Sequence, residues 1–100
     1  MNLIEKAFTE LFPDKEFNFE PELKYSRAFS AYNANVRYTK DKLMFRLSRD
    51  WKGVSQEIQM GLIQSLMLKI FKAKKKTTNI DLYNMFLKNV HISAPKENID

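Results

Sequence analysis

Side chains that carry most enzyme chemistry are scarce in this chain of 100 residues. It has no Cys and a single His, His91, so a thiolate metal site and a His-dependent nucleophile both lack the residues they need. We expect His91 to be a surface or helix-end residue. The Asp and Glu residues are scattered, and the only glycines, Gly53 and Gly61, exclude a glycine-rich phosphate loop. These residue types predict a protein without catalytic activity, metal or cofactor.

The composition is typical of one small globular domain. Hydrophobic residues make up 44% of the chain and aromatic residues 13%, and the formal net charge of +5 favours an acidic partner, above all nucleic acid. No apolar run reaches the roughly 18 residues of a membrane span. The first residues lack the apolar block of a signal peptide. We therefore expect a soluble, cytoplasmic protein with one domain at 1–92, no membrane partner and a flexible C-terminal tail at 93–100.

The spacing of apolar residues predicts a helix, three strands and two further helices. Asn2, Ser55 and Thr78 stand where the helices would begin, and each has a side chain that can cap a helix N-terminus. We expect helices over residues 2–11, 55–72 and 79–90, and alternating strands over residues 22–26, 34–40 and 42–48. This order predicts an α+β fold with an N-terminal helix, a three-stranded antiparallel sheet, and two C-terminal helices packed on one face.

Four short motifs follow one another in the middle of the chain. They are Tyr25-Ser26-Arg27, Phe45-Arg46-Leu47-Ser48, Val54-Ser55-Gln56-Glu57 and Leu62-Ile63. In order and spacing the stretch at 24–67 resembles the core of SprT-like zinc metallopeptidases and of the smaller minigluzincins. The resemblance implies a strand, a loop, and then a helix that carries the zinc motif H-E-x-x-H directly after Leu62-Ile63.

The chain departs from that family at every position of the zinc motif. Zinc hydrolysis needs two imidazoles one helical turn apart and a carboxylate that activates water. The matching positions hold Gln64, Ser65 and Leu68, which supply neither imidazole nor carboxylate. We expect Gln64 and Ser65 either to sit hydrogen-bonded or solvated at the rim of a former cleft, or to line a relict groove that holds a peptide or nucleotide. The sequence thus predicts a metal-free, inactive relative.

Basic residues form two groups that could contact phosphates. The first lies at and after the C-terminus of the long apolar helix and either complements its dipole and aids solubility or binds phosphate. The second projects from the sheet face opposite the helices and is either an ordinary solvated face or a grip on a nucleic-acid backbone, together with Asn35 and Met44. The first group is Lys69, Lys72, Lys74, Lys75 and Lys76, and the second is Lys24, Arg37, Lys42 and Arg46.

These features support two main functional hypotheses. The first is a SprT-like pseudoenzyme that binds DNA or RNA through its basic surfaces, with Tyr32, Trp51 and Tyr83 stacking on bases if they are exposed; we expect Trp51 instead to pack over the start of the long helix. The alternative is a protein-interaction module that takes a peptide into its groove or onto an edge strand, or that self-associates as a dimer. A residual hydrolase with unrecognised chemistry is a third, weaker hypothesis.

Overall fold

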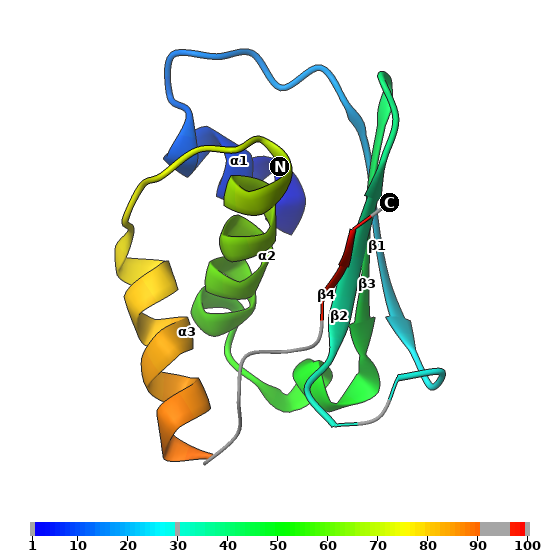
Figure 1. The fold of residues 1–100 in the computed structure, drawn as a ribbon, viewed down its shortest axis with the longest axis vertical. Coiled ribbons are helices and arrows are strands. Elements are labelled where there is room, and N and C mark those ends of the chain that lie inside the picture. The colour runs from blue at the N-terminus through cyan, green and yellow to red at the C-terminus, as the bar shows by residue number, and fades with distance from the viewer. Residues whose placement is uncertain (1, 30, 91–96, 100) are drawn as a thin grey trace.

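Three helices cover one face of a four-stranded sheet and leave the other face open (Figure 1). The computed structural model describes residues 2–29, 31–90 and 97–99. The predicted α+β class, with its helices on one side of the sheet, is confirmed. In chain order the elements are α1 (Leu3–Leu11), β1 (Glu20–Ser26), β2 (Ala34–Tyr38), β3 (Lys42–Ser48), a short 3-10 turn η1 (Arg49–Gly53), α2 (Gln56–Ile70), α3 (Thr78–Asn89) and β4 (Glu97–Ile99).

The strand order corrects the prediction of a purely antiparallel sheet. The order is β1-β3-β2-β4, so β3 lies between β1 and β2. The hairpin of β2 and β3 is antiparallel as expected, but β1 runs parallel to β3 with Leu23 opposite Phe45. Alternation determines which face of a strand is buried and not which strand lies beside it. The segment that joins β1 to β2 therefore passes the end of β3 instead of forming a hairpin.

The C-terminal end of the chain adds the fourth strand. We predicted a flexible tail at 93–100, whereas residues 97–99 form β4 and pair in parallel with β2, placing Glu97 opposite Ala34. His91 and the remainder of the predicted tail lie outside the described residues. In the described part of the chain, no helix has the length and apolarity to cross a bilayer.

Side-chain caps begin each long helix, and one of them differs from the prediction. Asn2 Oδ1 accepts the backbone N–H of Glu5 at 2.8 Å, and Ser55 Oγ accepts that of Ile58 at 3.4 Å. For α3 the cap is Thr77 and not Thr78, because Thr77 has the extended backbone of a cap. Its hydroxyl accepts the N–H of Ile80 at 3.0 Å.

The core lies between the sheet and α2. Of the predicted inward residues, Val36, Leu43, Phe45 and Leu47 are fully buried, whereas Leu23 and Tyr25 on β1 are half-buried and Tyr38 at the end of β2 is exposed. Trp51 is also fully buried, with Tyr32 and Phe86 packed against its ring at centroid distances of 5.1 and 5.6 Å. Trp51 is therefore a core residue and does not offer its ring to a base.

The packing of α2 on α3 depends on Gly61. A Cβ at this position would stand 2.0 Å from the carbonyl oxygen of Asn79 and 2.7 Å from the Cβ of Tyr83. No side chain fits such distances, so glycine is what allows the two helix backbones to approach. Tyr83 itself is nearly fully buried in this contact and is not available for base stacking.

Candidate nucleic-acid interface

Gln64, at the first position of the zinc motif, lies in the interior of the protein. Its side chain is 0% exposed. The amide nitrogen donates to Glu10 Oε1 at 2.9 Å and to the carbonyl of Ala7 at 3.3 Å, and the amide oxygen accepts the hydroxyl of Thr77 at 2.6 Å. Gln64 thus connects α1, α2 and the start of α3. Both predicted positions of Gln64, at the rim of a cleft and in an open groove, are therefore wrong.

The other two positions of the motif share no opening with Gln64. Ser65 and Leu68 are half-buried, and Leu68 packs against the hydrophobic core. None of these three residues lines the hollows described below. Within the ranges that the structure describes, no three His, Cys, Asp or Glu residues gather in a way that could hold a metal ion.

The four predicted cations of the sheet do come together on its open face. Alternation along β1, β2 and β3 turns Lys24, Arg37, Lys42 and Arg46 away from the helices. The register sets Lys24 and Asn35 on either side of Arg46, and it sets Arg37 beside Met44. This open face, defined by the outward residues of β1, β3 and β2, is called the outer sheet face.

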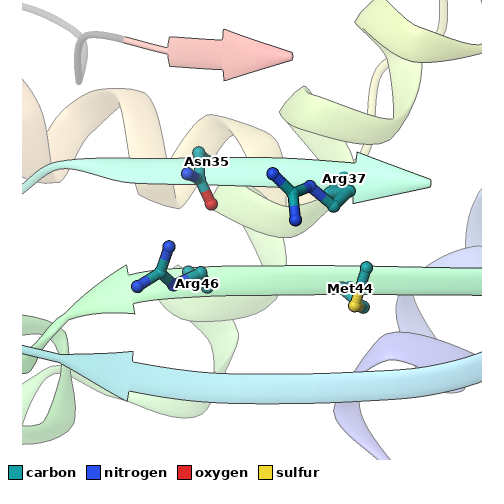
Figure 2. A pocket seen from close by; sticks show the side chains of 4 residues that line it. All are labelled: Asn35, Arg37, Met44 and Arg46. Atoms are coloured by element: carbon teal, nitrogen blue, oxygen red, sulfur yellow. The ribbon is translucent and has the colours of Figure 1, made fainter. Parts of the chain in front are cut away.

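Two arginines line a shallow hollow on the outer sheet face (Figure 2). Its volume is about 60 Å³, and its walls are Asn35, Arg37, Met44 and Arg46. A neighbouring hollow of about 250 Å³ extends it across β3 toward Glu22 and Lys24. Arg37 and Arg46 occupy diagonal positions on paired strands, where side chains are roughly 7–8 Å apart at the backbone. Both arginines therefore contribute to the lining of the same hollow.

Electrostatics divide the outer sheet face into a compensated part and a cationic part. The Glu22 carboxylate contacts Lys24 Nζ at 2.9 Å and Lys42 Nζ at 3.2 Å. Lys24 first, and then Lys42, lower the pKa of the Glu22 carboxyl below its usual range. Arg46 forms no ion pair with any described residue, and its guanidinium lies 5.5 Å above the ring of Phe29. Arg46 is therefore a stronger anion-binding group than the two lysines that Glu22 compensates.

The lysines at the end of α2 and in the segment after it lie on the helix side of the sheet and not on the outer sheet face (Figure 1). All five predicted residues, Lys69, Lys72, Lys74, Lys75 and Lys76, are exposed. Lys75 turns back to α1, where its ammonium donates to the carbonyl of Leu11. Lys72 has a positive φ of 52° and ends α2. The two basic groups of the sequence are thus separate surfaces.

Two contributors to the outer sheet face were missed in the sequence. Glu22 alternates in step with Lys24, so its position on this face could have been found from the sequence. Its contact with Lys42 needed the pairing of β1 with β3, and the approach of Phe29 to Arg46 needed the path of the loop after β1.

The comparisons with known proteins assign no relative to this chain. No protein-family model matches it, and searches of curated proteins and of solved structures find no significant match. The resemblance to SprT-like peptidases therefore remains a prediction from the sequence motifs.

Proposed function

We propose that this chain is a non-catalytic domain that binds nucleic acid through its outer sheet face. The observation that carries the proposal is the pair of guanidiniums of Arg37 and Arg46 at the hollow between β2 and β3 (Figure 2). A guanidinium matches phosphate oxygens in a two-pronged geometry that a lysine cannot reproduce. The open side of a sheet also leaves room for an extended strand of nucleic acid.

The chemistry of the face favours contacts to the backbone over contacts to bases. In the described part of β1, β2 and β3, no aromatic side chain points outward. The ring that the structure does place at this face, Phe29 in the loop after β1, is covered by the guanidinium of Arg46, so base stacking contributes little here. Asn35 can hydrogen-bond to a sugar or a base edge, and Met44 offers an apolar contact. We expect binding that tolerates many sequences and weakens with salt.

The non-catalytic part of the proposal concerns the zinc-motif positions. The amide of Gln64 is engaged on both sides by residues of other helices, so it has a structural task in the fold. We further propose that the chain is related to SprT-like peptidases and that α2 corresponds to their zinc-binding helix. In this relation the helix would keep its packing role and lack the zinc ligands.

The alternative, strand addition by a partner peptide, is supported by the position of β1 at the edge of the sheet. That edge carries Pro21, and Glu20, Glu22 and Lys24 are charged, features that protect edge strands from pairing. We therefore rank strand addition second.

The test is fluorescence anisotropy with labelled single- and double-stranded oligonucleotides at low and at physiological salt. Two variants, each of which replaces basic residues with glutamine, are compared with the wild type. One changes Arg37 and Arg46 to Gln, and the other changes Lys72, Lys74, Lys75 and Lys76 to Gln. We expect the arginine variant to lose most of the affinity and most of its salt dependence, although fewer charges are removed.

Each other outcome has a definite meaning. Binding that the arginine variant keeps and the lysine variant loses would move the interface to the end of α2. No binding of the wild type at low salt would reject nucleic-acid binding and favour a protein partner at β1. Both variants should first show the wild-type circular dichroism spectrum, and since all six residues are exposed we expect that they do.

A further inference from the structure

A third hollow lies on the helix side of the sheet, between α1, the linker after it and the end of α2. Its volume is about 320 Å³, which is at the lower end of the roughly 300–1,000 Å³ typical of small-molecule sites. Phe8 and Phe12 come from the end of α1, and Lys15 and Phe19 from the linker. Phe71 and Ala73 follow α2 and complete the wall. All the lining residues except Lys15 are apolar.

The phenylalanines hold one another in place. Phe8 and Phe12 are 5% and 6% exposed, and their ring centroids are 5.1 Å apart. The ring of Phe71 meets both of them edge-on at centroid distances of 6.1 and 6.0 Å. Rings that pack in this way have few other orientations, so the wall exists before a ligand arrives. An apolar group can enter without the cost of ordering these side chains.

Two ammonium groups converge on one ring of this wall. The Nζ atoms of Lys15 and Lys75 lie 5.3 and 4.9 Å from the centre of the Phe12 ring. Neither forms a salt bridge with a described residue, including the acidic neighbours Asp14 and Glu16 in the linker. Lys15 lines the hollow, and Lys75 lies outside its wall with its ammonium donating to the carbonyl of Leu11. An anion in the hollow would gain attraction from Lys15 directly, and the positive charge of Lys75 on the same ring would add to it.

We propose that this hollow binds a small free carboxylic acid with one alkyl or aryl body. The body enters among Phe8, Phe12, Phe19 and Phe71, and the carboxylate meets Lys15. The apolar wall selects against polar ligands, and Lys15, with the charge of Lys75 nearby, selects the sign of the head group. This site shares no residue with the outer sheet face, so the proposal stands or falls independently of nucleic-acid binding.

The experiment titrates the full chain with decanoate while backbone amide shifts are followed by NMR, below the concentration at which micelles form. Decanol and decylammonium are controls with the same chain and a different head, and hexanoate is a control with a shorter chain. We expect shifts at Phe12, Lys15, Phe71 and Ala73. Affinity should rise about fourfold for each added methylene, and decanol should bind roughly two- to fivefold more weakly than decanoate.

Three variants test the position of the ligand. Ala73→Leu fills the hollow and should abolish the shifts, Lys15→Glu should weaken decanoate and strengthen decylammonium, and Lys40→Glu in the β2–β3 hairpin should change neither. Equal affinity for decanoate and decylammonium would overturn the proposal, as would decanoate binding that survives Ala73→Leu. Tighter binding of AMP at the same amides would overturn it in favour of a nucleotide. If Ala73→Leu does not fold, unchanged decanoate affinity in the exposed Lys15→Glu variant is the overturning result.

Discussion

The hydroxyl of Thr77 donates to the buried amide oxygen of Gln64 at 2.6 Å while it accepts the backbone N–H of Ile80 at 3.0 Å. One hydroxyl therefore caps α3 and joins that helix to the interior of α2. On its other side Gln64 holds Glu10, which also accepts the side-chain amide of Asn79 at 3.0 Å. The three helices meet in a polar network inside an apolar helix layer.

Gln64→Leu should destabilise the protein. Leucine has a comparable size, but it leaves the part-buried Thr77 hydroxyl without its acceptor and the buried carbonyl of Ala7 without the Gln64 donor, which costs about 1–3 kcal/mol. Urea unfolding measures the loss as a lower midpoint with an unchanged slope. The control is Ser65→Ala on the same helix, half-buried and outside this network, for which we expect a change below about 0.5 kcal/mol. A Gln64→Leu variant as stable as the wild type would show that the network contributes nothing.

Gly61→Ala tests the close approach of α2 and α3. Alanine favours the helix by about 1 kcal/mol. Its Cβ would nevertheless meet the Asn79 carbonyl at 2.0 Å, and because that atom belongs to the backbone of the neighbouring helix it cannot simply swing aside. We expect a net destabilisation of about 1–3 kcal/mol, the usual cost of overpacking. Gly53→Ala is the matched control, since nothing lies within 4 Å of a Cβ built there. Equal effects at Gly61 and Gly53 would contradict the packing argument.

The sequence predicted which side of each helix and strand is buried. It did not predict the contacts between segments that are far apart in the chain. Alternation alone placed Val36 and Phe45 inward and Arg37 and Arg46 outward, so most of the outer sheet face was predictable. Gln64 could not be assigned, because a glutamine in an apolar helix fits a solvated rim as well as a buried network. The difference depends on Glu10, which is 54 residues away. The insertion of β3 beside β1 was missed for the same reason.

Lys72→Gly should stabilise the protein. Lys72 has a φ of 52°, and the N–H groups of Lys72 and Ala73 donate to the carbonyls of Lys69 and Leu68 in the pattern that ends many helices. The left-handed conformation costs a residue with a Cβ about 1 kcal/mol, and it costs glycine nothing. Glycine loses more conformational entropy on folding, which offsets part of this gain. We expect a gain of about 0.5–1 kcal/mol by urea unfolding. Lys74→Gly, two residues further along in the segment between α2 and α3, should give no gain, and a similar gain there would argue against the backbone explanation.

Tyr25→Phe should remove a stabilisation that depends on pH. The phenol of Tyr25 donates to Gln59 Oε1, and Gln59 Nε2 donates to the carbonyl of Val54 at 2.8 Å. Burial raises the pKa of Tyr25. The folded state therefore holds this proton more tightly than the unfolded chain, in which the pKa is about 10. The contribution of Tyr25 is complete below that value and is lost as pH rises through the higher folded pKa.

The measurement for Tyr25 is the difference in unfolding free energy between wild type and Tyr25→Phe, from pH about 8 to about 11. We expect the wild type to be more stable by about 1 kcal/mol at the lower end, the net value of one hydrogen bond. The difference should shrink toward zero at the upper end. Taking the difference cancels the titration of the lysines and the other tyrosines. A gap that stays constant over this range would mean that folding leaves the pKa of Tyr25 unchanged, which would contradict the raised folded pKa.

Glu22→Gln should strengthen nucleic-acid binding if the outer sheet face is the interface. The Glu22 carboxylate compensates Lys24 and Lys42 and would repel a phosphate backbone laid across β1 and β3. Its removal should tighten oligonucleotide binding about two- to fivefold at low salt, the range of a surface charge interaction, with a smaller gain at physiological salt. Glu57→Gln, an exposed carboxylate at the start of α2 with the same change in net charge, is the control. If both variants tighten binding equally, the effect comes from net charge alone. That result would argue against the outer sheet face as the binding site.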